Sequence, residues 1–142
     1  MALEHISETE GNIIKNIASE LEKNAAKYGG ESLARLFITN PGSKAYFSYD
    51  ENNLESLQEH GKRVITAVAN AARNLNDLKG SLDELATKHG SDLLVDPLNF
   101  PAFSRCIQVT LANHLQSFTP ADQLALDKFL KALNGYLSSK YR

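Results

Sequence analysis

Apolar residues recur at steps of three and four along most of the chain, the spacing that places side chains on one face of an α-helix. The stripe is clearest mid-chain, where it runs Leu57, His60, Val64, Val68, Ala71 and Leu75. No segment shows the strict alternation of apolar and polar residues that a half-buried strand needs. The pattern therefore predicts an all-α fold with about seven helices.

Polar residues mark where these helices should begin. A serine followed three residues later by a glutamate forms a capping box, and two matches lie at Ser7 with Glu10 and at Ser81 with Glu84. Asp96-Pro97 and Thr119-Pro120 each place a capping side chain directly before a proline, which is typical of a first helical turn.

Other residues indicate helix ends and close contacts. We expect a break at Asn24 and a helix end before Pro41. Gly29-Gly30 and Gly61 lie inside predicted helices, where glycine costs helix propensity. We expect these glycines to let another helix approach closely.

Composition narrows the class of protein. The 142 residues are 42% apolar and 23% charged, with a formal net charge of -2, so we expect one domain spanning residues 1–142. This balance leaves no basic excess for a nucleic-acid partner. The single cysteine, Cys106, lies in an apolar run, so we expect a buried and inert thiol. No apolar run is long enough to span a membrane and no signal peptide is evident, so we expect a cytoplasmic location.

Two histidines fall on apolar stripes, His60 on one predicted helix and His89 on the next. A buried imidazole needs a hydrogen-bond partner or a metal. Taken singly, each is better explained as a core histidine that bonds a carbonyl. Together, on facing elements, they favour a shared ligand, although their spacing does not identify it.

Several short runs resemble the globin family, and the likeness covers nearly the whole chain. They are YF at 46–47, HGKRV at 60–64, LATKH at 85–89, VDPLNF at 95–100, LDKFL at 126–130 and SKYR at 139–142. The final Tyr-Arg pair is similar to the end of alpha-type chains of vertebrate haemoglobin.

The resemblance implies a haem b group between the two histidine helices, with His89 as the proximal iron ligand and His60 on the distal side. A haem with one axial imidazole leaves a position for a diatomic ligand. Oxygen gains a hydrogen bond from the His60 N–H, whereas carbon monoxide gains less because it carries less charge. The other pocket residues implied by family position are Leu33, Tyr46, Phe47, Val64, Ala67, Val68, Leu85, Leu93, Val95, Asn99, Phe100, Phe103, Leu130, Leu133 and Leu137.

These pocket assignments have plainer alternatives. The apolar residues could form an ordinary core, and most would serve as both core and pocket. Arg63 is placed to reach a haem propionate, although a solvated basic residue explains it nearly as well.

The resemblance also implies assembly with beta-type haemoglobin chains, two of each, and transport of oxygen in the cytoplasm of the erythrocyte. Residues at matching contact positions are Arg35, Pro41, Tyr46, Asp96, Pro97, Asn99, Phe118, Pro120, Asp127, Tyr141 and Arg142.

Some positions depart from the family pattern. The segment between Phe47 and His60 is about two residues short, and Lys88 replaces a usually apolar residue beside His89. Gln123 stands where a histidine is often seen. These changes leave both histidines in place but bear on cooperativity and on pH linkage.

We expect an oxygen carrier and not an enzyme. The alternatives are a haem redox enzyme (nitric-oxide dioxygenase, nitrite reductase or peroxidase-like) and a ligand-sensing globin in which His60 itself binds iron.

Overall fold

The computed structural model describes residues 6–46, 54–81, 83 and 99–141, and every element among them is helical. The α-helices are α1 (Glu8–Lys23), α2 (Ala25–Thr39), α3 (Leu54–Arg73), α5 (Phe100–His114) and α6 (Pro120–Tyr141). Two 3-10 helices, η1 (Pro41–Tyr46) and η2 (Leu75–Asp77), follow α2 and α3. The predicted all-α class is confirmed.

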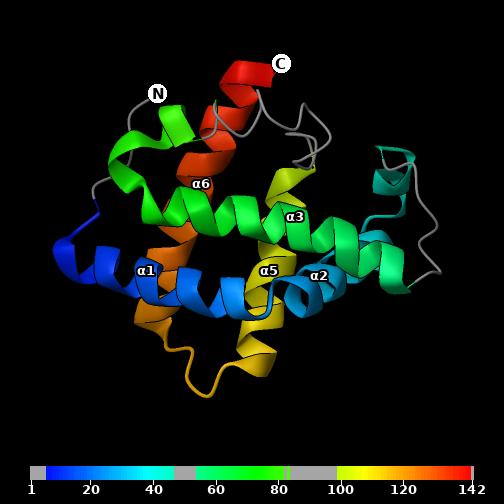
Figure 1. Ribbon diagram of the computed structural model, residues 1–142, viewed down its shortest axis with the longest axis horizontal. Helices are drawn as coiled ribbons and strands as arrows, with labels where there is room; N and C mark the ends of the chain where they lie inside the picture. The colour runs from blue at the N-terminus through cyan, green and yellow to red at the C-terminus, as the bar shows by residue number, and fades with distance from the viewer. Residues whose placement is uncertain (1–5, 47–53, 82, 84–98, 142) are drawn as a thin grey trace.

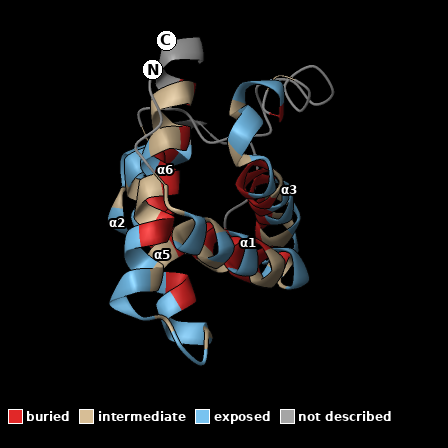
Figure 2. Cartoon of the chain, turned by 90° about the vertical axis from the view of Figure 1, so that its left-hand side faces the viewer, coloured by how far each residue is buried: buried red, intermediate tan, exposed pale blue. Residues whose placement is uncertain are grey.

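The helices pack in two crossing groups. In Figure 1, α1 and α3 run side by side across the view, while α5 and α6 cross behind them. The most extensive packing is between α2 and α3, and α2 also packs on α5. Figure 2 shows buried positions along one side of each helix and exposed positions on the other, as the three- and four-residue spacing predicts.

Two predicted helix starts are confirmed by their hydrogen bonds. At α1 the Glu10 amide donates to the Ser7 hydroxyl (3.1 Å), and the Ser7 amide donates to the Glu10 carboxylate (3.0 Å). At α6 the same exchange joins Thr119 and Asp122, at 3.2 and 2.9 Å. The break at Asn24 and the helix end before Pro41 are also confirmed.

The predicted start at Ser81 is wrong. Residues 78–81 are already helical, because the Asp77 carboxylate accepts from the Gly80 amide (3.0 Å) and caps this turn earlier. Ser81 is buried inside the helix, and its hydroxyl accepts from the Asn70 side chain (2.9 Å). The serine therefore makes a contact with α3 and does not cap the helix.

The crossing of α2 and α3 depends on two glycines. A Cβ added to Gly61 would overlap the backbone carbonyl of Gly29 and lie 2.6 Å from the Gly30 amide nitrogen. A Cβ on Gly29 would likewise overlap the Gly61 backbone. The two helices therefore touch backbone to backbone, and the predicted close approach is confirmed.

Glu10 links α1 to α6 in addition to capping α1. Its carboxylate oxygens lie 2.9 and 3.1 Å from the Lys128 Nζ. The backbone hydrogen bond from Ser7 and then the bond from Lys128 hold the pKa of Glu10 below its usual value. Glu10 is therefore ionised in the folded chain at neutral pH.

We predict that Gly61→Ala lowers the free energy of unfolding by about 1–3 kcal/mol, because neither backbone can retreat without losing core contacts. Gly11→Ala is the matched control, since nothing lies within 4 Å of the added carbon. That change should stabilise the chain by about 0.5–1 kcal/mol through helix propensity. Urea unfolding midpoints measure both, and equal effects of the two substitutions would contradict the close crossing.

We predict that Glu10→Gln destabilises the chain only where the carboxylate is ionised. A lowered folded-state pKa contributes stability above the unfolded-state pKa, and this stability is lost as the pH falls through the folded-state pKa. The gap between wild type and variant should therefore be full near pH 7 and should close in acid, as urea titrations from pH 7 to pH 2 would show. Glu8→Gln is the control, because Glu8 lies in the same helical turn but is exposed and makes no bond to α6 in the described structure.

Candidate functional site: the distal half of a haem pocket

The centre of the candidate site is His60, which α3 places one residue before the glycine crossing. Its Nε2 atom is buried, although the residue as a whole is only partly covered. Val64 lies one helical turn further along the same face and is fully buried. α3 therefore turns one imidazole nitrogen and one branched apolar side chain toward the interior.

Arg63 lies against the opposite edge of the same imidazole. Its guanidinium nitrogen is 3.4 Å from Nδ1 of His60. A guanidinium can only donate hydrogen bonds, so this contact favours the tautomer in which Nδ1 accepts and Nε2 carries the proton. In that tautomer the buried nitrogen of His60 is a hydrogen-bond donor.

Apolar side chains from four helices lie in the interior that His60 adjoins. The apolar pocket residues whose side chains the structure describes are all at most 1% exposed. They are Leu33, Val64, Ala67, Val68, Phe100, Phe103, Leu130, Leu133 and Leu137. Most of them belong to one continuous core cluster. Core and pocket wall are therefore the same residues, as the sequence suggested.

Asn99 adds an unexplained polar atom at the start of α5. Its Nδ2 is buried and meets no hydrogen-bond acceptor within the described part of the chain. A buried donor without a partner costs free energy, so such an atom points to a ligand or another chain as its acceptor. Apolar walls, a buried imidazole N–H and a buried amide donor together fit a haem, whose flat apolar ring carries polar edge groups.

Several predicted site residues lie outside the described residues. They are Phe47, Leu85, His89, Leu93, Val95, Asp96, Pro97 and Arg142. The side chains of Tyr46 and Tyr141 are not described either, although both residues lie within helices. The proximal half of the site, and His89 with it, remains a prediction.

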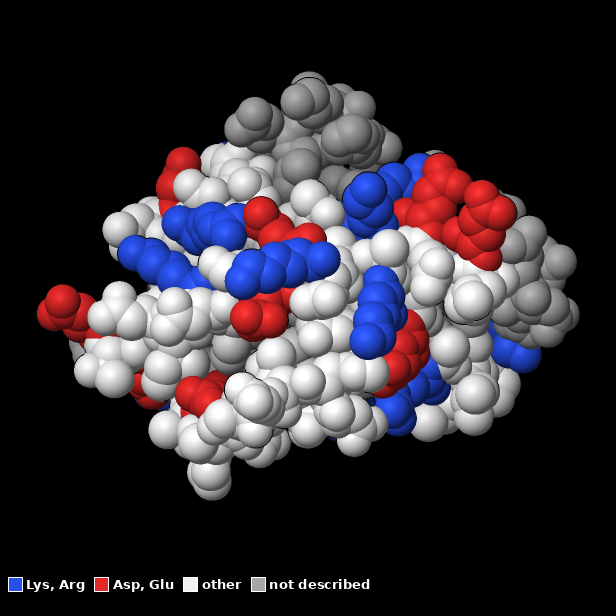
Figure 3. Space-filling view, turned by 60° about the horizontal axis from the view of Figure 1, so that its bottom comes forward, with Lys and Arg blue, Asp and Glu red and all other residues white. Residues whose placement is uncertain are grey.

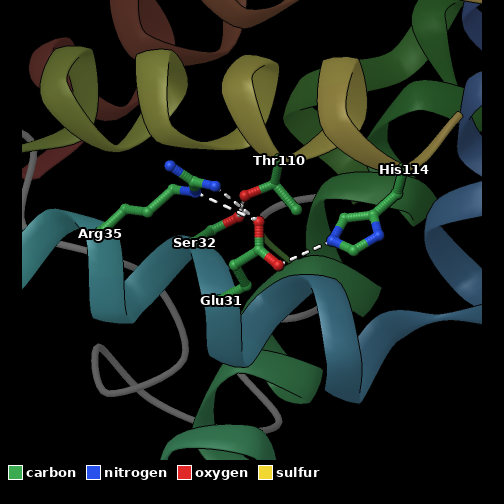
Figure 4. A network of polar contacts seen from close by, with 5 residues as sticks. All are labelled: Glu31, Ser32, Arg35, Thr110 and His114. Carbon is green, nitrogen blue, oxygen red and sulfur yellow. Dashed lines mark hydrogen bonds and ion pairs between the residues drawn. The ribbon is translucent and has the colours of Figure 1, made fainter.

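The structure also shows a polar cluster that the sequence did not reveal (Figure 4). Glu31 accepts from Arg35 (3.1 Å) on its own helix and contacts Nε2 of His114 on α5 (2.7 Å). Burial raises the pKa of Glu31, but the bonds from His114 and Arg35 outweigh this and the net shift is downward. The spacing of Glu31 and Arg35 hinted at an ion pair, whereas no local pattern points to His114, 83 residues away.

Arg35, predicted as a subunit contact, is bonded to Glu31 in this cluster.

Large apolar residues are exposed on three of the helices: Ile38 of α2 (79%), Val109 of α5 (45%) and Leu124 of α6 (53%). Among the other predicted contacts, Pro41 and Pro120 are exposed and Phe118 is half-buried. Asp127 accepts from Gln108 of α5 at 3.2 Å.

The charged surface and the thiol add two details. On the face shown in Figure 3, basic and acidic side chains are interspersed and do not gather by sign. Among the described helices, none combines the length and apolar character that crossing a bilayer requires. Cys106 is buried, as expected, and burial raises its pKa, which disfavours the reactive thiolate.

The chain was compared with known families, proteins and structures. The globin family model matches residues 30–137. The haemoglobin alpha subunit of Mustelus griseus is 50% identical over 94% of this chain and 96% of its own, and that of Squalus acanthias is 44% identical over 96% and 99%. The solved deoxy haemoglobin of Mustelus griseus and the haemoglobin of Isurus oxyrinchus each superpose with a TM-score of 0.86 at 48% identity, covering 97% of this chain and all of theirs. The chain belongs to the globin family, and its fold is the globin fold.

Proposed function

We propose that this chain is an alpha-type haemoglobin subunit that binds oxygen reversibly on haem b, with His89 as the axial iron ligand and His60 on the opposite side. The observation that carries the proposal is the buried Nε2 of His60, in a wall of apolar side chains from four helices. Full-length similarity to alpha subunits of haemoglobin supports the same assignment.

Each residue has a definite task in this proposal. Haem supplies a ferrous iron with one position open to a diatomic gas. His89 holds the group in place through one imidazole nitrogen. His60 donates a hydrogen bond from its Nε2–H to a gas molecule that carries partial negative charge. The contact with Arg63 at Nδ1 keeps the ring proton on Nε2. Val64 and Phe103, both fully buried, exclude water.

The hydrogen bond from His60 stabilises bound oxygen more than bound carbon monoxide. The ratio of oxygen affinity to carbon monoxide affinity is therefore higher than in a pocket without a donor. A hydrogen bond to a charged or strongly polar acceptor contributes about 1.5–3 kcal/mol, and a weakly polar acceptor gains less. The protein therefore needs no rearrangement to discriminate, because the donor is already in place on α3.

The first test is the absorption spectrum of the purified chain with haem, in the ferrous state before and after oxygen is added. A five-coordinate ferrous spectrum that converts reversibly to a stable oxygenated form supports the proposal. A six-coordinate ferrous spectrum would mean that His60 itself binds iron and would favour a sensor. Rapid conversion to the ferric state would favour redox chemistry instead.

We predict that His89→Gly abolishes the five-coordinate ferrous spectrum and that millimolar imidazole restores it, because the free ring can occupy the space of the missing side chain. His114→Gln is the control, since His114 lies on the outer end of α5 and bonds Glu31. That variant should give a normal spectrum. Retention of the spectrum in His89→Gly without imidazole would refute the ligand assignment.

The partner under this proposal is a beta-type haemoglobin chain, in the cytoplasm of the erythrocyte. The exposed residues Ile38, Val109 and Leu124 lie on α2, α5 and α6, the helices that also carry the predicted contacts Arg35 and Asp127. Exposed apolar side chains rimmed by polar ones are typical of a protein interface. Gln108 joins α5 to α6 here, because it bonds both Asp127 and Gln123 (3.3 Å).

We predict that Val109→Lys weakens assembly with a beta-type chain by about tenfold or more, because the interface would bury an unpaired charge. Leu54→Lys is the matched control, since Leu54 is also exposed (65%) but lies on α3, which carries none of these three residues. Sedimentation of each variant mixed with a beta-type chain measures the effect. Equal assembly of the two variants would remove this face from the interface.

A further inference from the structure

A short helical segment that precedes His89 in the sequence is hydrogen-bonded to two other helices. Residues 78–81 and 83 are helical, and we call them the 78–83 segment. Asn70 of α3 donates to the Ser81 hydroxyl at 2.9 Å. Tyr136 of α6 donates its phenolic proton to the Asp83 carboxylate at 2.6 Å. The first bond leads to the helix of His60 and the second to the C-terminal helix.

The Tyr136–Asp83 bond is the stronger of the two. A hydroxyl donating to a carboxylate at 2.5–2.7 Å is a charge-assisted hydrogen bond, about twice as strong as a neutral one. This bond is partly buried and joins residues 53 apart in sequence. It therefore fixes tertiary structure, because no local helical contact could replace it.

The second carboxylate oxygen of Asp83 has a separate partner. It accepts from Lys79 Nζ at 2.8 Å, one turn earlier in the same segment. This hydrogen bond raises the pKa of the Lys79 amine, as expected beside an ionised carboxylate. Lys79 is largely exposed, so its bond supports only the local helix, whereas Tyr136 connects the segment to α6.

We infer that Tyr136 is a positioning residue for His89, and that it acts by tying the 78–83 segment to α6. The inference rests on the proposed function, because it takes His89 as the iron ligand. α6 also supplies the pocket residues Leu133 and Leu137, which lie within one turn of Tyr136. The helix that supplies part of the pocket wall is thus also bonded to Asp83, six positions before His89 in the sequence.

The test compares the haem-loaded wild-type chain with Tyr136→Phe, which removes the hydroxyl and keeps the ring. Hydrogen–deuterium exchange at the amides of the 78–83 segment should rise about tenfold, the effect of losing one hydrogen bond to a charged group. The iron–imidazole stretching band of the ferrous protein should shift or broaden, which a purely structural role would not cause. Exchange in α1, which makes no contact with this bond, should stay unchanged.

Lys79→Gln is the matched control, because it removes the Lys79 bond to Asp83 and leaves the link to α6 intact. Lys79→Gln should leave the iron–imidazole band in place. It should raise amide exchange in the 78–83 segment less than Tyr136→Phe does. If Tyr136→Phe folds poorly, Asp83→Asn gives the same test with a weaker acceptor and a smaller rise. Unchanged exchange and band position in Tyr136→Phe, or equal effects in Lys79→Gln, would overturn the inference. Absence of the band in the wild type would instead refute His89 as ligand, while exchange would still report the link.

Discussion

The close crossing of α2 and α3 is the constraint on which the rest of the structure depends. Gly29 and Gly61 allow the two backbones to touch, so Leu33 and Val64 come together in a single wall. His60 directly precedes one of these glycines. A side chain at either glycine would push the two helices apart and shift His60 relative to α2. The backbone contact thus fixes how the α3 residues that flank Gly61, His60 among them, lie against α2.

Polar interactions between helices then hold the other helices around this crossing. The three described next join residues that are distant in the sequence. Lys128 connects α6 to the start of α1, and His114 connects α5 to α2. Arg73, near the end of α3, pairs with Glu22 and donates to Ser19 of α1 at 3.2 Å. Of these contacts the Arg73–Glu22 pair is the most exposed, and an exposed ion pair contributes little free energy by itself. Together the three contacts favour one relative placement of helices that apolar packing alone would define less precisely.

The sequence predicted those features that depend on local pattern. Capping at Ser7 and Thr119, burial along the helical stripes and the role of the glycines all follow from residue type and spacing. Ser81 shows the limit, because a capping motif matched by sequence was instead a tertiary contact with Asn70. The proton position on His60 and the partner of Glu31 could not be predicted, since each depends on atoms brought together by folding. The placement of His89 lies outside the described residues, so its assignment rests on resemblance.

Cys106 illustrates how a structural detail becomes a means of observation. It lies on α5 within reach of Thr39 and Arg35, in the layer where α5 covers α2, and its raised pKa keeps it as the thiol. A reagent that needs the thiolate should react slowly in the folded chain and faster when these two helices separate and water reaches the sulfur. Because Cys106 is the single cysteine of the chain, the rate of its chemical modification would report how often α2 and α5 separate.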